Sequence, residues 1–295
     1  MPATTNQARI RQVLQNHDRL GETPLWCERT QKLWWIDIEQ PRLQSYDPAS
    51  AEHVVYPFEC DWLGSLALTK TADLIVATDL SLRRFNPATN TSTPLIEVEI
   101  NLDNRLNDGR VDTRGRLWVG TMDNGLSEPN GSLYRVDADA RLTTHLTDIV
   151  VSNGIAHSPD GRTMYMTDTR RFTTWAFDVD SEAGTLHNQR IFADYTQTGD
   201  RPDGATVDVD GCLWQAFFSG GKVVRYTPNG DIDRVIELPV SNPTCVCFGG
   251  QDFRTLYITT ARKFLSDKQL AQEPQAGSLL AIEGVGQGLP EHRFG

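Results

Sequence analysis

The sequence lacks any long apolar run. Among its 295 residues, no window approaches the roughly 18 consecutive apolar residues that a membrane-spanning helix requires. The first 15 residues, MPATTNQARIRQVLQ, contain no apolar segment of the kind that defines a secretory signal peptide. We therefore expect a cytoplasmic protein with no membrane partner. Residues 1–8 are expected to form a disordered tail, and the 39% hydrophobic content is enough for a full core.

Positive charge is also scarce. The chain has 28 Lys and Arg residues against 39 Asp and Glu residues, which gives a formal net charge of −11. This imbalance argues against nucleic acid or an anionic membrane as a partner, because both attract basic surfaces. It is compatible with a cation site or a small-molecule partner, and it leaves the oligomeric state open.

Paired cysteines, long helical periodicity and a Gly-x-Ser-x-Gly motif are missing as well. Five irregularly spaced cysteines without an export signal indicate free thiols, and Cys245 and Cys247 alternate as in a buried strand. Residues 261–272 could form a short helix or a loop. The absence of the Gly-x-Ser-x-Gly turn argues against a serine esterase mechanism.

A short apolar and aromatic motif recurs six times along the chain. Its copies are LWWID, LIVATD, LWVGTM, MYMTDT, LWQAFF and LYITTA, which begin at residues 33, 74, 117, 164, 213 and 256. Their starts are 41, 43, 47, 49 and 43 residues apart, a period typical of a four-stranded propeller blade. The sequence therefore predicts an all-β protein: a single-domain, six-bladed β-propeller over residues 1–295. The segment ARIRQVLQNHD is expected to supply a strand that closes the last blade.

Four blades carry an acidic or amide residue about ten residues before this motif, where the strand nearest the axis should begin. These residues are Glu22, Asn107, Asn153 and Asp203. In PDGATVDVDGCLW, residues 202–214, the second Asp-Gly pair is placed for the hairpin turn, whereas Asp203-Gly204 marks the entry of the inner strand. Glu22, Asn153 and Asp203 would offer three converging oxygens, which suit a hard divalent cation such as Ca²⁺. The alternative, that each residue only caps a turn or strand entry, stays open at this point.

The same stretches resemble a known family. GETPLW, NRLNDGRVDTRGRLWVGTM, SNGIAHSPDGRTMYMTDT, RPDGATVDVDGCLW and CFGGQDFRTLYITTAR are similar to the SMP-30/gluconolactonase/luciferin-regenerating family, in order and from about residue 20 onward. The resemblance implies a six-bladed propeller with one divalent metal ion at the mouth of its channel. It also implies hydrolysis of a sugar-acid lactone, the small-molecule partner that we expect.

The resemblance also assigns roles to individual residues. It implies that Glu22, Asn153 and Asp203 bind the metal ion, with Ca²⁺ favoured and Zn²⁺, Mn²⁺ or Mg²⁺ as alternatives, and that Asp203 is the catalytic acid/base. Arg105 and Asn107 match substrate-binding positions. Some members carry an acidic substrate contact two positions after the GTM motif, where this sequence has Asn124. Two other functions remain open: a calcium-binding regulatory protein of the regucalcin type, and a phosphotriesterase-like hydrolase.

Overall fold

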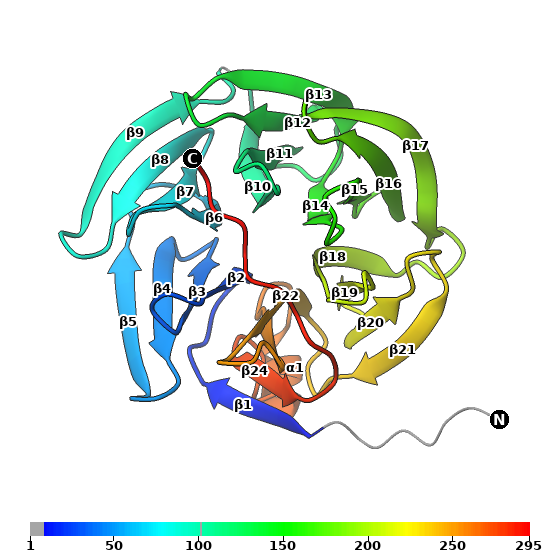
Figure 1. The fold of residues 1–295 in the computed structure, drawn as a ribbon. Coiled ribbons are helices and arrows are strands. Elements are labelled where there is room, and N and C mark those ends of the chain that lie inside the picture. The colour runs from blue at the N-terminus through cyan, green and yellow to red at the C-terminus, as the bar shows by residue number, and fades with distance from the viewer. Residues whose placement is uncertain (1–8, 101) are drawn as a thin grey trace.

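Six four-stranded antiparallel sheets surround a central axis in the computed structural model, which describes residues 9–100 and 102–295 (Figure 1). This arrangement confirms the predicted six-bladed β-propeller. The tail expected at residues 1–8 lies outside the described residues.

Blades 1 to 5 are each built from four strands that follow one another in the chain, whereas blade 6 takes its outermost strand from the N-terminus; the strands are given from the inside outward. Blade 1 contains β2 (Gly21–Cys27), β3 (Lys32–Asp37), β4 (Arg42–Asp47) and β5 (Glu52–Pro57). Blade 2 contains β6 (Leu63–Leu68), β7 (Leu74–Thr78), β8 (Ser81–Asn86) and β9 (Thr91–Glu97). Blade 3 contains β10 (Asn104–Val111), β11 (Leu117–Asp123), β12 (Gly131–Val136) and β13 (Leu142–Ile149). Blade 4 contains β14 (Ser152–His157), β15 (Thr163–Asp168), β16 (Thr173–Asp180) and β17 (Thr185–Asp194). Blade 5 contains β18 (Arg201–Val207), β19 (Leu213–Phe218), β20 (Lys222–Tyr226) and β21 (Ile232–Glu237). Blade 6 contains β22 (Pro243–Gly249), β23 (Thr255–Thr260), β24 (Leu279–Glu283) and β1 (Ile10–Leu14).

The recurring sequence motif forms the second strand of every blade, and its apolar side chains fill the space between neighbouring blades. Trp214 of β19, for example, is fully buried and shares one cluster with Val246 and Phe248 of β22. Each large apolar side chain buried in this way contributes about 1.5–3 kcal/mol. The repeat therefore specifies the ring because each blade buries its face against the next one.

The N-terminal strand closes the ring, as the sequence predicted. Strand β1 pairs antiparallel with β24, with Ile10 opposite Ile282. The segment between β1 and β2 is fixed by Asp18, a buried carboxylate that accepts hydrogen bonds from Trp35 Nε1 at 2.9 Å and from Gln44 Nε2 at 2.8 Å. The junction between the first and last blades is thus held by a strand pairing and by a buried polar cluster.

Three second strands end in an aspartate, or are directly followed by one, that fixes the start of the inner strand of the same blade. Asp37, Asp79 and Asp168 accept hydrogen bonds from backbone N–H groups that lead into β2, β6 and β14. The N···O distances are 3.1 Å for Leu20, 2.9 Å for Trp62 and 3.2 Å for Val151. These bonds satisfy backbone donors at the channel mouth and set where each inner strand begins.

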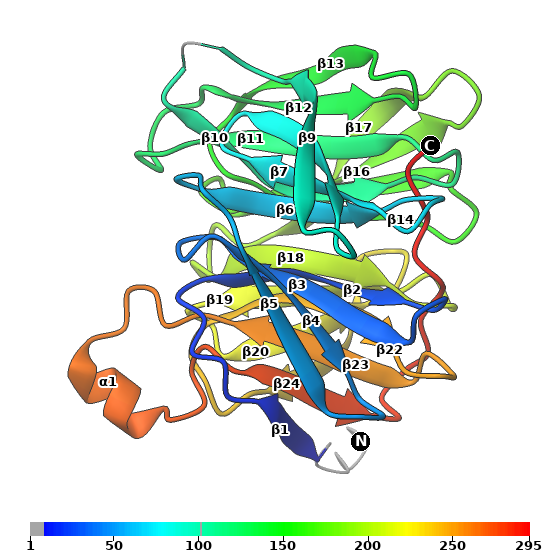
Figure 2. The same ribbon diagram turned by 90° about the vertical axis from the view of Figure 1, so that its left-hand side faces the viewer.

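The final residues, 284–295, form a segment that we call the C-terminal strap. It crosses the channel mouth at the C-terminal ends of the inner strands (Figure 1) and is anchored by Phe294, which is 1% exposed. Helix α1 (Asp267–Gln272), within the segment where a short helix or loop was expected, lies at the other end of the ring (Figure 2). No helix in residues 9–100 and 102–295 is long and apolar enough to cross a membrane.

Candidate active site at the open mouth of the channel

All six inner strands shift register with their neighbour near the mouth away from the strap. The shifts fall between Glu22 and Leu25, Leu63 and Leu66, Leu106 and Gly109, Asn153 and Ala156, Pro202 and Ala205, and Pro243 and Cys245. A bulge turns a side chain away from the regular alternation of a strand. The predicted site residues of β2, β10, β14 and β18 therefore occupy the irregular part of each inner strand.

The two Asp-Gly pairs of β18 and its turn differ in role, as the sequence analysis expected. Asp210-Gly211 lies in the β18–β19 turn, where Gly211 has φ +80°. Asp203 and Gly204 lie inside β18, as its third and fourth residues, in the stretch where the register shifts. The sequence placed Asp203 at the entry of the inner strand, whereas in the structure it is the third residue of β18.

Two backbone positions in these irregular stretches have left-handed conformations. Thr23 has φ +47°, unusual for a β-branched residue, and its N–H donates to Glu22 Oε2 at 2.8 Å. Gly154 has φ +57°, and a Cβ at this position would lie 3.0 Å from the carbonyl oxygen of Asp203. Glycine therefore allows β14 and β18 to approach closely beside Asn153 and Asp203.

A chain of hydrogen bonds connects three of the predicted residues. Arg105 Nη1 donates to Asn107 Oδ1 at 2.5 Å, and Asn107 Nδ2 donates to Asn153 Oδ1 at 2.9 Å. Asn153 Nδ2 in turn donates to Thr169 Oγ1 at 2.8 Å. The guanidinium of Arg105 also lies over the ring of Trp62, 5.5 Å from its centroid. All three predicted residues are buried, so their side chains are held in one orientation.

Glu22 and Asp203 form the acidic part of the site. Burial, with the negative charge of Asp108 in addition, raises the pKa of Glu22 to about 8. Burial raises the pKa of Asp203 well above its usual range, and the charge of Glu22 adds to this rise. The guanidinium of Arg105 opposes both shifts. The structure therefore brings Glu22, Asp203 and Arg105 together, although they come from three different blades.

Asp108 is a further acidic residue that the sequence analysis did not select. It is buried, and its carboxylate accepts hydrogen bonds from the backbone N–H of Gly109 at 2.8 Å and of Ile155 at 2.7 Å. Ile155 belongs to the irregular stretch of β14, so Asp108 holds the backbone that carries Asn153. In the sequence, Asn107-Asp108-Gly109 has the composition of a turn, and this hid a residue of the inner strand.

Asn124 lies apart from these residues, at the rim of the mouth. Its Nδ2 donates to Asp103 Oδ1 at 2.9 Å, and its backbone N–H donates to the carbonyl oxygen of Asp103 at 3.1 Å. No hydrogen bond joins its side chain to Arg105 or Asn107 within the described residues. The structure thus brings together five of the six predicted residues and leaves Asn124 at the edge.

The donor set can be tested against a divalent cation. No group of three or more His, Cys, Asp or Glu side chains with the geometry of a metal site occurs within residues 9–100 and 102–295. The predicted set differs, because it combines two carboxylates with the amide oxygen of Asn153. All three donors are hard oxygens, and the two carboxylates are buried close enough to repel each other. These features fit a hard divalent cation.

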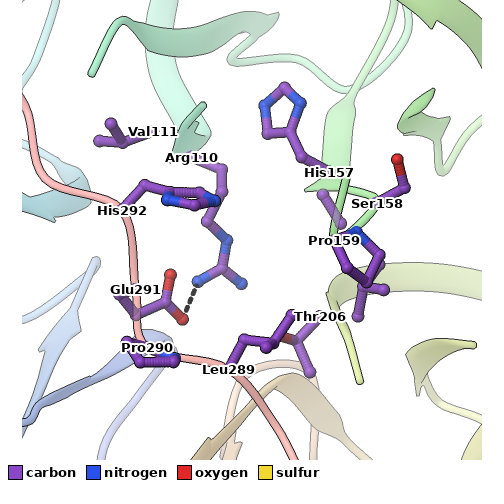
Figure 3. Close-up of a pocket in the computed structure, with 12 residues that line it drawn as sticks. Arg110, Val111, His157, Ser158, Pro159, Thr206, Leu289, Pro290, Glu291 and His292 are labelled. Carbon is purple, nitrogen blue, oxygen red and sulfur yellow. Dashed lines mark hydrogen bonds and ion pairs between the residues drawn. The ribbon is translucent and has the colours of Figure 1, made fainter. Parts of the chain in front are cut away.

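The mouth that the C-terminal strap crosses is lined by different residues. Beneath the strap lies a cavity of about 50 Å³ lined by residues that include Arg110, His157 and Glu291, and Arg110 Nη1 forms an ion pair with Glu291 Oε1 at 2.8 Å (Figure 3). Burial lowers the pKa of His157 to about 4, so its ring is neutral near pH 7. None of the predicted site residues lines this cavity. Because the strap crosses this end, the site is approached from the other mouth.

The fold and the site together define a class of protein: a six-bladed propeller with a buried, acidic, oxygen-rich site at one mouth of its channel. Residues 20–262 match the family described as SMP-30/Gluconolactonase/LRE-like region. The chain belongs to this family, as its sequence motifs indicated.

Three relatives show how close the similarity is. The 6-deoxy-6-sulfogluconolactonase of Pseudomonas putida is 38% identical over 287 residues, which cover 96% of this chain and 97% of that protein. The L-arabinolactonase of Azospirillum brasilense is 37% identical and covers 93% and 92% of the two chains. The crystal structure of the calcium-binding protein regucalcin from Agrobacterium tumefaciens superposes with a TM-score of 0.92 at 30% identity and covers 97% and 98%.

Proposed function

We propose that this protein hydrolyses the lactone of a pentose- or hexose-derived sugar acid to the free aldonic acid, with one divalent cation bound by Glu22, Asn153 and Asp203. Two relatives that match nearly the whole chain are named as lactonases, one for a sulfogluconolactone and one for an arabinolactone. Ca²⁺ is the favoured ion because all three donors are hard oxygens and because one structural relative is a calcium-binding protein.

One observation carries the proposal: buried acidic groups and buried hydrogen-bond donors converge at the same mouth. Glu22 and Asp203 are acidic, whereas the guanidinium of Arg105, which is hydrogen-bonded to Asn107, presents donors next to them. A protein that only bound ions would have no need of a buried guanidinium, which repels cations. A hydroxylated ester requires such donors, because they orient its hydroxyl groups and its carbonyl oxygen.

Lactone hydrolysis requires a proton to move from water to the ring oxygen. In the proposed reaction, Asp203 accepts a proton as the oxygen of water bonds to the carbonyl carbon. It then returns the proton to the ring oxygen as the ester C–O bond breaks. Burial raises the pKa of Asp203, which brings this carboxyl closer to neutral pH and makes it a better base than an exposed aspartate.

The remaining groups orient the substrate and stabilise charge. When bound, the divalent cation polarises the ester carbonyl and lowers the pKa of water. Burial lowers the pKa of Arg105 to about 10, so its guanidinium stays charged at neutral pH and can stabilise developing negative charge. Asn107 donates one N–H to the carbonyl oxygen of Ser152 and the other to Asn153, so it can offer the remaining lone pair of its oxygen to a substrate hydroxyl.

A panel of aldonolactones tests the proposal. Purified protein would be stripped with a chelator and reloaded with Ca²⁺, Zn²⁺, Mn²⁺ or Mg²⁺, and ring opening would be followed by proton release against the spontaneous rate. We expect hydrolysis of at least one lactone, loss of activity with chelator, and loss of activity in Asp203→Asn. Asp139→Asn, an exposed carboxylate in the β12–β13 turn, is the matched control.

Two outcomes would overturn the proposal. Activity on phosphotriesters but on no lactone would favour the phosphotriesterase-like function. Tight Ca²⁺ binding in calorimetry without any accelerated hydrolysis would favour a regulatory calcium-binding protein of the regucalcin type.

A further inference from the structure

The rim of the open mouth contains an acidic side chain, Asp103, to which no role has yet been assigned. Asp103 directly precedes β10, and it lies opposite Asn124 where the β10–β11 ladder continues past the pair Asn104–Asp123. In a strand, residues two apart point to the same face, so Asp103 and Arg105 share one side of β10. Asp103 is exposed, whereas Arg105 is buried, and together they extend from the rim into the channel.

Two other acidic side chains near Asp103, those of Glu99 and Asp123, have structural roles. Glu99 is buried and accepts hydrogen bonds from Asn104, Thr121 and Tyr134 at 2.6–2.8 Å. Asp123 accepts hydrogen bonds from two backbone N–H groups in the loop after β11, those of Ser127 and Glu128, both at 2.9 Å. Both of these side chains are buried, whereas that of Asp103 is exposed at the rim.

The amide of Asn124 is also committed. Its Nδ2 donates to Asp103 Oδ1, and its Oδ1 is buried with no hydrogen-bond partner among the described residues. The reverse orientation of the amide would place two oxygens against each other. Asn124 therefore fixes the carboxylate of the exposed Asp103, whose second oxygen, Oδ2, has no hydrogen-bond partner within residues 9–100 and 102–295.

We propose that Asp103, held in position by Asn124, is the acidic substrate contact at the channel mouth and accepts hydrogen bonds from hydroxyl groups of the sugar lactone distant from the ester. This inference rests on the proposed function for the chemistry of its ligand. It moves the substrate contact expected at Asn124 to the neighbouring strand and makes Asn124 a positioning residue. A carboxylate is the natural partner for hydroxyl groups because it only accepts hydrogen bonds, and charge strengthens them.

A charge swap tests this assignment. The variants are Asp103→Asn, Asn124→Asp, the double variant, and Asp61→Asn as a control. Asp61 is also exposed at this mouth, before β6, and its contact with Asp79 uses only the backbone N–H. For the best hydroxylated lactone, Asp103→Asn should raise KM roughly tenfold, as expected for the loss of a charged hydrogen bond, with kcat within about twofold. An unsubstituted lactone should respond to no variant.

The double variant carries the sharpest expectation. Asn124→Asp alone places two carboxylates together and should impair KM, whereas in the double variant the amide at position 103 can donate to the carboxylate at position 124. Most of the affinity should then return. The inference is overturned if Asp103→Asn behaves as Asp61→Asn does, or if the two substitutions impair KM additively.

Calorimetry with a neutral sugar alcohol separates this inference from the proposed function. If the wild-type protein opens no lactone, the proposed function fails. Weaker binding of the sugar alcohol to Asp103→Asn, restored in the double variant, would still support the hydroxyl contact, and equal binding by all variants would overturn it.

Discussion

Replacing Arg105 by alanine should separate substrate binding from cation binding. The guanidinium is 6% exposed and has three contacts in the site: the carbonyl oxygen of Leu106 at 3.2 Å, Asn107 Oδ1 at 2.5 Å, and the ring of Trp62. In the proposed function it adds a charged hydrogen bond to the substrate. The loss of one such bond costs about 1.5–3 kcal/mol, so kcat/KM should fall roughly ten- to a hundredfold.

The affinity for the cation should not fall together with kcat/KM in this variant. The charge of Arg105 counteracts the raised pKa of both Glu22 and Asp203, so it is close enough to repel a cation bound there. Without that charge, the two carboxylates attract a cation more strongly, although Asn107 loses its tether. We therefore expect Arg105→Ala to bind Ca²⁺ at least as tightly as the wild-type protein does.

Steady-state kinetics at saturating metal and calorimetric titration of the chelator-treated protein measure the two effects. Arg83→Ala is a suitable control, because Arg83 contacts Ser92 on the outer part of blade 2. Guanidinium chloride at low concentration should partly restore activity in Arg105→Ala, since the variant leaves a space of that shape. If excess metal alone restores the wild-type rate, Arg105 acts through the cation and the assignment to substrate is wrong.

Two further predictions concern stability. Because the pKa of Glu22 is about 8 in the folded protein, the metal-free native state holds a proton that the unfolded chain releases near pH 4.5. The free energy of unfolding in urea should therefore fall as pH rises from about 4.5 to 8, and Glu22→Gln should flatten this slope; an identical slope in both proteins would contradict the prediction. Phe294→Ala should destabilise the fold by about 3–5 kcal/mol, measured by thermal unfolding, because this buried ring anchors the strap. Its KM for a lactone at 25 °C should stay within about twofold, since the strap lies at the other mouth, and a large change in KM would show that the strap shapes the site.

The fold could be predicted because the residues that recur in the sequence are the ones whose burial between blades stabilises the ring. The second strand of each blade has an apolar and aromatic motif, and the turn before it often contains Asp-Gly or Arg-Gly. Closure of the ring by residues 10–14 was also predictable, because the sixth repeat otherwise lacks a strand. These features are local, so a single sequence is enough to reveal them.

The irregular parts of the inner strands could not be read from the sequence in the same way. A register shift depends on how a strand pairs with its neighbour, and no single residue type marks it: the shifted stretches contain Thr23-Pro24 in one blade and Asn107-Asp108 in another. Asp108 was missed for this reason. Its function in the fold, to hold the N–H of Ile155 in another blade, is a tertiary contact without any signature in spacing.

The charge balance of the channel gives an independent argument for the cation. Glu22, Asp108 and Asp203 are three buried carboxylates, and Arg105 is the guanidinium next to Glu22 and Asp203. The other buried guanidinium on this strand, Arg110, is matched by Glu291 of the strap. When all three carboxylates are ionised, two negative charges remain beyond the charge of Arg105, and in the metal-free state the raised pKa of Glu22 means that a proton neutralises part of this charge. A monovalent ion would leave half of that charge unmatched and a trivalent one would exceed it, so the arrangement suits a divalent cation.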